Sequence, residues 1–424
     1  MNKRNFTLIV LAAMVLGVAL GWWLHAYRAA DVATASPYFS SVTTIFLRLI
    51  GMVIAPLVLT TLIAGIAHMG GGGALGRVGA RTIGWFLLAS ITSLLLGLAI
   101  VHILQPGVNA GLTLPPQDAS SGIEASSLNV QDFITHLVPK SLIEAMANNT
   151  ILQIVVFAGF FGVALASMGE EAKPVVDLTE RVAHVMLRVV SYVMWFAPFA
   201  VFAAIAKTVA ESGPAVLWTF GKFIADFYLA LGVLWAVLIG AGFLIVGPRI
   251  LKLMGMLREP ILVAFSTASS EAAYPRTFEQ LEHWGVSRRI AGFVLPIGYS
   301  FNLDGSMMYC TFATLFIAQV YGIELSITQQ ISMLLLLMIT SKGMAGVPRA
   351  SLVVIAATLT AFGLPQQGLV LILAVDHFLD MGRSATNVVG NSIASAVVAK
   401  WEKELGPGTV APVPPAVPLA QETE

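Results

Sequence analysis

The sequence has few charged residues and a single cysteine, and each shortage excludes a class of protein. Only 11% of its 424 residues are charged, whereas soluble domains carry about 25%. The 23 basic and 23 acidic residues cancel, so the charge balance does not indicate a nucleic-acid partner. Cys310 has no second cysteine with which to form a disulfide, and the Cys-x-x-Cys and His-Glu-x-x-His spacings of zinc sites are absent.

Long hydrophobic runs dominate the rest of the composition. Hydrophobic residues make up 57% of the chain, which predicts an all-α polytopic membrane protein, since a helix of about 20 apolar residues spans the bilayer. Eight continuous segments are long enough, near residues 6–27, 40–69, 80–105, 142–168, 185–210, 217–248, 287–320 and 366–400. The first follows Lys3 and Arg4 as a signal peptide would, but its length and the lack of a small-x-small cleavage site favour an uncleaved span.

Two further apolar stretches, residues 255–284 and 327–363, are interrupted. Polar residues break the first at 266–271, and glycines and a proline break the second at 341–349. Basic residues follow the even-numbered spans, and the 106–132 connection has no Lys or Arg, as expected if positive charge stays inside. All basic loops lie on the cytoplasmic side only if each interrupted stretch enters and leaves the membrane on the same side. Both stretches are therefore expected to be re-entrant hairpins, the first from the cytoplasm and the second from outside, with both termini cytoplasmic.

Irregular backbone at membrane depth is tolerated only where it is buried in protein or lines a wet cavity. Hairpins that enter from opposite faces predict an inverted repeat, with the tips meeting at a midplane site. Residues 302–306 read Asn-Leu-Asp-Gly-Ser and predict a further break inside the seventh span. The proline-rich sequence after Leu405 predicts a disordered tail.

The last apolar segment carries a polar stripe. At 100° per residue, five of its polar side chains fall within an arc of about 80°; they are Asp376, Asp380, Arg383, Asn387 and Asn391. A charge at bilayer depth costs roughly 2.5–3.5 kcal/mol or more. An intrahelical Asp380–Arg383 ion pair is the structural alternative, but five polar residues on one stripe beside two broken segments favour a pathway for a charged solute.

Three of these side chains match an acidic amino acid. The guanidinium of Arg383 fits a carboxylate, Asn387 can donate to a second carboxylate, and Asp380 can accept from an ammonium group. In the broken seventh span, Asp304 either caps a half-helix, binds a small cation together with unwound carbonyls, or carries a proton. The hairpin tips, with Ser269 and Ser270 in the first, would attract anions through free amides and helix N-termini.

Other functional classes explain less of the sequence. Asp304 and Asp376 would have to share a proton at close range in an intramembrane aspartyl protease, which leaves Arg383 and Asn387 without a role. A passive channel is the second alternative, and uptake against a gradient that depends on an ion gradient would exclude it. A purely structural membrane protein does not account for the buried charged stripe.

Residues 6–403 resemble the dicarboxylate/amino acid:cation symporter family, the glutamate-transporter fold. The most specific matches are the 302–306 block, Ala-Gly-Val-Pro at 345–348, and the segment from Asp380 through Gly390. The resemblance implies eight transmembrane helices with two re-entrant hairpins, in a homotrimer in a bacterial-type plasma membrane (inner membrane). It also implies a scaffold (residues 1–75 and 107–212), a transport domain that moves like an elevator (76–106 and 213–402) with the second hairpin as outer gate, and a disordered cytoplasmic tail (403–424).

The resemblance also implies roles for individual residues. Arg383 would bind the distal carboxylate of glutamate or aspartate, Asp380 the amino group, and Asn387 and Ser306 the α-carboxylate. Four residues would close the site: Ser269, Ser270, Gly346 and Val347. Ser384 would line it. Candidate cation sites involve Gly298, Ser300, Asn302, Asp304, Ser341, Lys342, Met344, Asn387 and Asn391. Asp304 and Asp376 are the candidate proton carriers, and the implied co-transported ion is Na⁺ or H⁺ without any cofactor.

The sequence departs from the sodium-coupled members of the family. Asn391 replaces an aspartate ligand, Phe86 and Ala89 replace hydroxyl residues although Ser90 remains, and Ala268 replaces an arginine of some members. These changes weaken at least two sodium sites, so we expect proton coupling or fewer sodium ions. The surroundings of Asn391 resemble C4-dicarboxylate carriers, but Asp380 suits an ammonium group, so we expect glutamate or aspartate as substrate.

Overall fold

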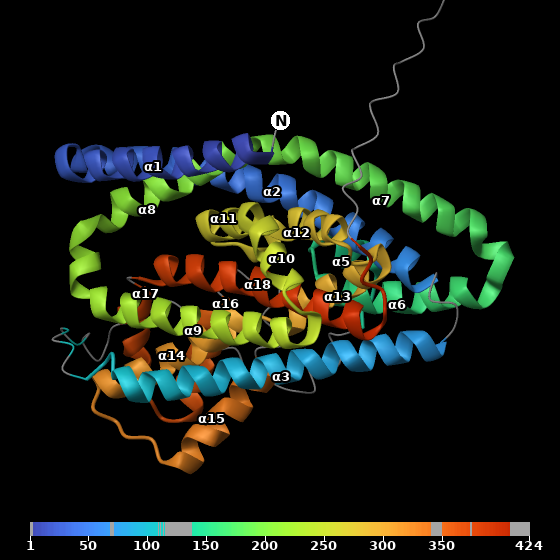
Figure 1. Ribbon diagram of the computed structural model, residues 1–424. Coiled ribbons are helices and arrows are strands. Elements are labelled where there is room, and N and C mark those ends of the chain that lie inside the picture. Colours follow the sequence, from blue (N-terminus) through green and yellow to red (C-terminus); the bar gives the residue numbers. More distant parts are fainter. Residues whose placement is uncertain are drawn as a thin grey trace, which may run out of the picture.

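The computed structural model is a bundle of helices (Figure 1). It describes residues 3–67, 72–108, 138–340, 350–373 and 375–407, together with the single residues 110, 112 and 114. No β-strand occurs among these residues, apart from an isolated bridge between Val286 and Leu405. The expectation of an all-α protein is therefore confirmed for the described part of the chain.

The first half of the chain forms long helices. They are α1 (Lys3–Tyr27), α2 (Ala29–Ala67), α3 (Gly72–Leu104), α5 (Leu142–Ala147), α6 (Ile151–Met168), α7 (Lys173–Val193), α8 (Ala197–Thr219) and α9 (Gly221–Val246), with short 3₁₀ turns at Gly169–Ala172 and Met194–Phe196. Ser141 starts α5 by accepting a hydrogen bond from the Glu144 amide.

The second half is more broken. It contains α10 (Arg249–Met256), α11 (Arg258–Thr267), α12 (Ser270–Trp284), α13 (Arg288–Phe301), α14 (Asp304–Val320), α15 (Ile327–Thr340), α16 (Ala350–Ala361), α17 (Leu369–Leu373) and α18 (Asp376–Trp401), with a 3₁₀ turn at Gln366–Gly368. Helices long and apolar enough to cross a membrane by themselves number five in the described residues, and all of them lie before residue 247. The later segments lack such helices because breaks and polar side chains interrupt them.

The breaks expected in the second half are present where the structure describes them. The first hairpin turns between α11 and α12, where Ala268 adopts a left-handed conformation (φ 50°) and Ser269 caps α12. The seventh span breaks between α13 and α14, at Asn302 and Leu303. The second hairpin has its two helices, α15 and α16, whereas its tip at 341–349 lies outside the described residues.

Helix α18 runs through the middle of the molecule (Figure 1). It packs against α9, α11, α12, α13 and α14, and most of its residues from Leu379 to Ala399 are buried. Helices α1, α2, α7 and α8 pack against one another along the opposite edge, and α13 meets α2. The polar stripe of α18 therefore faces other helices rather than the outer surface.

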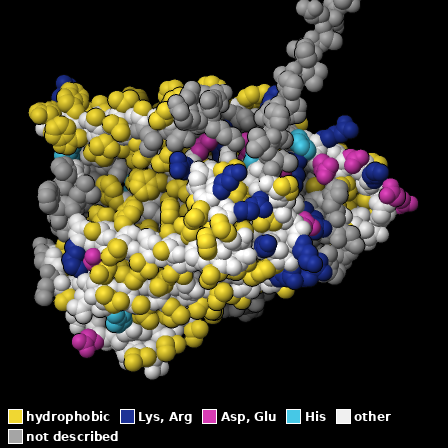
Figure 2. Space-filling view, viewed as in Figure 1, with side chains coloured by type: hydrophobic (Ala, Val, Ile, Leu, Met, Phe, Trp, Pro, Cys, Tyr) yellow, Lys and Arg dark blue, Asp and Glu magenta, His cyan; other side chains and the backbone are white. Residues whose placement is uncertain are grey.

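Charged side chains gather at one end of the face seen in Figure 2, whereas hydrophobic side chains cover much of the rest. This is the end where α3 begins and α18 ends. There Arg77 and Arg81 pair with Glu402 at 3.1 and 2.7 Å, and Arg289 pairs with Glu404. Residues 403–407, which we assigned to the tail, lie against the turn between α12 and α13, where the Gly406 amide donates to the Gly285 carbonyl. Residues 408–424 lie outside the described part.

Candidate functional site

Arg383 lies where three helices meet. Its Nε donates to Asp380 Oδ1 at 2.6 Å, one turn earlier on α18. Its Nη1 donates to Ser306 Oγ of α14 at 3.2 Å and to Ser351 Oγ of α16. The side chain is only 13% exposed. The intrahelical ion pair is thus present, but the same guanidinium also joins the broken span to the second hairpin.

An aromatic ring and a carboxylate extend this cluster. The guanidinium carbon of Arg383 lies 5.8 Å from the centre of the Tyr309 ring, within the range of a cation–π interaction. The Tyr309 hydroxyl donates to Asp376 Oδ1 at 2.7 Å, and Asp376 is 5% exposed. The candidate proton carrier Asp376 is therefore held through Tyr309 beneath Arg383.

Asn387 connects the stripe to the start of α14. Its Oδ1 accepts from the Gly305 amide at 2.9 Å, and its Nδ2 donates to Ser306 Oγ at 3.3 Å. Ser384 donates to Asp380 Oδ1 at 3.2 Å. The structure thus brings together five of the residues expected to bind substrate: Ser306, Asp380, Arg383, Ser384 and Asn387.

A second polar cluster lies further along α18, around Asp304. Asn302 Nδ2 donates to Asp304 Oδ2 at 3.0 Å and to Asn391 Oδ1 at 3.2 Å. Ser93 of α3 reaches Asp304 Oδ1 at 3.4 Å. Asn302, Asp304 and Asn391 are all 0% exposed, so this cluster is sealed from the surface.

Several polar atoms of the second cluster have no hydrogen-bond partner among the described residues. They are Ser300 Oγ, Asn302 Oδ1 and Asn391 Nδ2. Buried polar atoms are normally satisfied, and oxygen atoms left over beside a carboxylate suit a small hard cation. The carbonyl of Gly298, another expected ligand, accepts from the backbone N–H of Asn302 at 2.8 Å.

Three glycines allow the helices to approach closely here. A Cβ atom on Gly305 would collide with the backbone of Arg383, and one on Gly390 would collide with the Asp304 carboxylate. A Cβ on Gly298 would meet Asn391 and, at 3.3 Å, the ring of Phe86. Phe86 is fully buried, so an aromatic ring occupies the side of the cluster where we expected α3 to have lost a hydroxyl.

The first hairpin packs on α18, but its serines make only local bonds. Ser269 Oγ accepts from the Ala272 amide at 3.3 Å, and no hydrogen bond joins Ser269 or Ser270 to α18 among the described residues. Ala264 and Ala273 of the two hairpin helices pack with Val388 in a small apolar cluster, all 0% exposed. The expected residues at the tip of the second hairpin lie outside the described residues: Ser341, Lys342, Met344, Gly346 and Val347.

Three residues of these clusters were missed by the sequence analysis: Ser93, Tyr309 and Ser351. Tyr309 follows Ser306 by three positions, which places both on one helical face. Ser351 is a polar residue at the start of an otherwise apolar helix, and Ser93 lies one turn after Ala89 on α3. The position of Tyr309 on the face of Ser306 is a signal within the sequence, whereas Ser93 and Ser351 lie on other helices and reach the clusters through packing.

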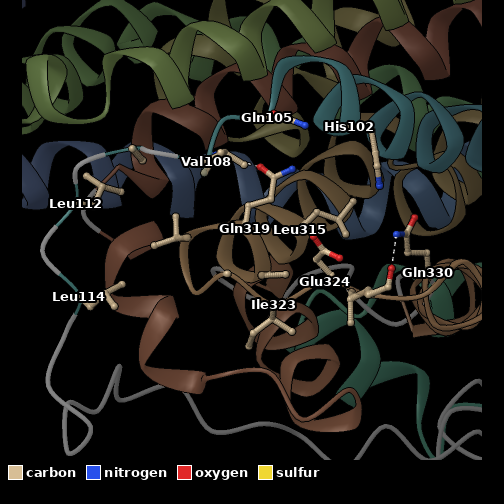
Figure 3. A pocket seen from close by; sticks show the side chains of 16 residues that line it. His102, Gln105, Val108, Leu112, Leu114, Leu315, Gln319, Ile323, Glu324 and Gln330 are labelled. Atoms are coloured by element: carbon tan, nitrogen blue, oxygen red, sulfur yellow. Dashed lines mark hydrogen bonds between the residues drawn. The ribbon is translucent and has the colours of Figure 1, made fainter.

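The cavity in Figure 3 is separate from both clusters. It has a volume of about 730 Å³ and lies at the ends of α3 and α14, between residues such as His102, Gln319 and Glu324. Figure 3 shows mixed polar and aliphatic side chains around it. Neither Arg383 nor Asp304 lines this cavity.

The model of the sodium:dicarboxylate symporter family matches residues 6–401. The chain belongs to this family. The proton/sodium-glutamate symport protein of Bacillus subtilis is 39% identical over 403 residues, 94% of this chain and 93% of that protein. The proton/glutamate-aspartate symporter of Escherichia coli is 39% identical over 412 residues, 95% and 94% of the two chains. The C4-dicarboxylate transport protein of Laribacter hongkongensis is 37% identical over 403 residues, 93% and 89% of the two chains. The chain is therefore a membrane symporter of this family rather than an enzyme.

Proposed function

We propose that this protein imports glutamate or aspartate together with cations, by an elevator movement of one part of the molecule against the other. Relatives named as glutamate and glutamate-aspartate symporters support the substrate class. We further propose that the chain has eight membrane spans, two re-entrant hairpins, an inverted repeat and cytoplasmic termini. It would form a homotrimer in a bacterial inner membrane. The scaffold is residues 1–75 and 107–212, and the transport domain is residues 76–106 and 213–402.

The position of Arg383 carries the proposal. A guanidinium in the middle of an apolar protein is costly unless its charge has a use, and this one lies between the broken span and the second hairpin. Its charge-assisted donors favour a carboxylate over any neutral ligand. Arg383 would bind the distal carboxylate of the substrate.

The remaining polar groups fit the other end of an amino acid. Asn387 and Ser306, which touch each other at 3.3 Å, would bind the α-carboxylate. Asp380 has Oδ1 bound to Arg383 and Ser384, and Oδ2 would accept from the ammonium group. The hairpin tips, with Ser269, Ser270, Gly346 and Val347, would close the site, and Ser384 would line it.

The Asp304 cluster would take up the co-transported cation. Its unpartnered oxygen atoms, Ser300 Oγ and Asn302 Oδ1, support a bound Na⁺. If the symporter is coupled to protons instead of sodium, Asp304 or Asp376 would carry the proton. Gly298, Asn387 and Asn391, with Ser341, Lys342 and Met344, would complete the cation ligands. Since Asn391 supplies an amide instead of a carboxylate, coupling to protons or to fewer sodium ions is expected.

The contact between α2 and α13 supports movement between the two parts. A Cβ on Gly65 of α2 would lie 3.3 Å from the Arg289 carbonyl oxygen, and one on Gly292 of α13 would lie 3.1 Å from the Thr61 carbonyl oxygen. Glycines on both helices therefore let the two backbones approach closely. We propose that α13 moves along α2 at this close contact when the transport domain moves.

Membrane voltage sets a lower limit on the coupling. Entry of a substrate with charge −1 against roughly 100 mV, negative inside, costs about 2.3 kcal/mol. One cation only cancels this charge, so we expect two or more per substrate and faster uptake at a more negative interior. The voltage dependence is measured as the uptake rate into vesicles held at defined potassium diffusion potentials. An uptake rate that does not change with voltage would contradict coupling to two or more cations.

The proposed function is tested by uptake of labelled aspartate, glutamate and succinate into proteoliposomes, with Na⁺ and H⁺ gradients imposed one at a time. We expect accumulation of the two amino acids with at least one gradient and none without a gradient. Equal flux in both directions without any ion gradient would indicate a passive channel instead.

A C4-dicarboxylate is the second candidate substrate. Asp380 Oδ1 is already bound by Arg383 and Ser384, which reduces the charge available to attract an ammonium group. A relative named as a C4-dicarboxylate transport protein shares 37% identity. Uptake of succinate in preference to aspartate in the same assay would favour this candidate.

A further inference from the structure

A polar contact on the side expected to be cytoplasmic joins α7 to α13. Arg288, at the start of α13, places Nη1 2.7 Å from His184 Nε2 of α7. The two residues lie 104 positions apart in the chain, and the proposed division assigns α7 to the scaffold and α13 to the transport domain. The contact must therefore break and re-form when one part moves against the other.

A hydrogen bond within α7 fixes the tautomer of His184. Its Nδ1 lies 2.8 Å from the Glu180 carbonyl oxygen. Since a carbonyl oxygen only accepts, Nδ1 carries the hydrogen, and Nε2 keeps the lone pair that accepts from Arg288. Both nitrogens of a protonated imidazole are donors, so the bond to Arg288 exists only while His184 is neutral.

The charges around the pair decide what protonation does to the contact. Residues of α7 move together with His184, so they act on its charge equally in every position of α13. Glu282 lies 3.4 Å from Arg288 Nε and offsets part of its charge, but no ion pair joins Glu282 to His184 among the residues that the structure describes. Repulsion from the touching guanidinium therefore exceeds attraction from the more distant carboxylate. The other titratable or charged side chains nearby are Glu279 and His283 of α12, Arg289 of α13, which pairs with Glu404, and Glu180, Arg181 and Arg188 of α7.

We infer that His184 and Arg288 form a proton-sensitive contact, which holds the transport domain against the scaffold while His184 is neutral and releases it when His184 is protonated. This inference rests on the proposed division into two moving parts. Imidazole is the side chain that ordinarily changes charge between about pH 5 and pH 8, and His184 is exposed, so protons from the aqueous phase reach it.

The surroundings leave room for the release. A cavity of about 180 Å³ lies between α2, α7 and α13, and Arg288 is one of the residues that line it. Helix α2 contributes only uncharged residues to this cavity, so it neither attracts nor repels the guanidinium through a charge of its own. Acidification of the cytoplasm would therefore loosen the transport domain from the position that it has in this structure.

The distance between the two parts tests the inference without any transport. Dyes are attached to cysteines that replace Lys173 of α7 and Lys252 of α10, both exposed, in a Cys310→Ser background that removes the native thiol. In substrate-free protein in lipid nanodiscs, we expect the population at the original distance to fall about threefold to tenfold between pH 8 and roughly pH 5.5, because a hydrogen bond becomes a repulsion. His184→Gln keeps an acceptor and does not titrate, so its distances are expected to stay unchanged.

Two further variants separate the charge of His184 from general effects of pH. His184→Lys is positive throughout this range and is expected to show at pH 8 the distances that the unmodified pair shows in acid. His283 is the matched control, because its Nδ1 also bonds to a carbonyl of its own helix, that of Glu279 at 2.7 Å, and no hydrogen bond joins it to α7 among the described residues. His283→Gln is expected to keep the full response to pH.

Four results would overturn the inference: distances that do not respond to pH in the unmodified pair, a response that persists in His184→Gln, a response that is lost in His283→Gln, or normal distances for His184→Lys at pH 8. Failure of the proposed function is a separate result, in which the unmodified protein accumulates no acidic substrate, since the distance measurement needs no substrate.

Discussion

Helix α18 carries two polar clusters, about 12 Å apart along its axis, that differ in charge and in access. The Arg383 cluster contains a charged pair, 13% and 14% exposed, and reaches the second hairpin. The Asp304 cluster around Asn391 has a single carboxylate among neutral amides, is 0% exposed and touches α3 and the broken span. In the second cluster Ser300 Oγ, Asn302 Oδ1 and Asn391 Nδ2 are buried without a hydrogen-bond partner among the described residues.

This difference indicates a division of labour along one helix. On the proposed function a large anion needs an entrance, and the Arg383 cluster is bonded to α16 of the second hairpin, which would supply it. A small cation or proton needs only oxygen atoms held at fixed positions, and we propose that the buried Asp304 cluster supplies them. Gly305 brings the backbone of α14 onto Arg383, and Asn387 bonds to the Gly305 amide, so the two clusters share α14 as a rigid connection.

The largest expected effect is the loss of the anion site. Arg383→Ala should reduce uptake of aspartate, glutamate and succinate by at least about 100-fold, because truncation of a buried charged partner costs roughly 2–5 kcal/mol or more. Initial rates in proteoliposomes measure the effect. Arg276→Ala removes another enclosed arginine, 18% exposed and paired with Glu259 at 3.0 Å, and should lose far less activity. Normal transport by the Arg383 variant would remove the basis of the proposed function.

The sealed cluster should respond differently. Asp304→Asn is expected to reduce gradient-driven uptake by roughly tenfold or more, because the only carboxylate beside the proposed cation is neutralised. Binding of labelled aspartate at saturating salt should change less than uptake, since Arg383 is intact. The matched change Asn302→Asp adds a carboxylate in the same cluster and should alter the ion dependence instead. A variant in which Asp304→Asn abolished substrate binding but preserved coupling would reverse the roles of the clusters.

Much of this comparison could be predicted from the sequence. The helical period placed the five polar residues of α18 on one face, and the Asn-Leu-Asp-Gly-Ser segment predicted the break between α13 and α14; both features are local. The interruption of the first hairpin at Ala268 and Ser269 followed from the same reasoning. These predictions succeeded because a charge or a helix break in an apolar segment is costly and therefore conspicuous.

The residues that the sequence analysis missed depend on packing between distant segments. Ser351 is one hydroxyl in an apolar helix, and nothing local distinguishes it from Thr358, whose hydroxyl bonds to its own backbone. The role of Tyr309 depends on the packing of α14, which places its ring 5.8 Å from the Arg383 guanidinium carbon and lets its hydroxyl donate to Asp376. Ser93 approaches Asp304 across 211 positions of the chain. Such partners are set by how α3, α14, α16 and α18 pack.

The smallest effect concerns discrimination within the Arg383 cluster. Asp380→Ser keeps a short polar side chain but removes the negative charge that faces an ammonium group, so the apparent KM for aspartate should rise several-fold to tenfold. Succinate has no ammonium group and avoids repulsion by the lost carboxylate, so its KM should be unchanged or lower. Competition between the two substrates in one vesicle preparation measures the ratio directly, independent of the amount of active protein. Ser384→Ala removes the other partner of Asp380 Oδ1 and is the control, because it leaves the charge in place. An equal rise in KM for both substrates would show that Asp380 acts only by orienting Arg383, and the first cluster would then bind carboxylates without selecting amino acids.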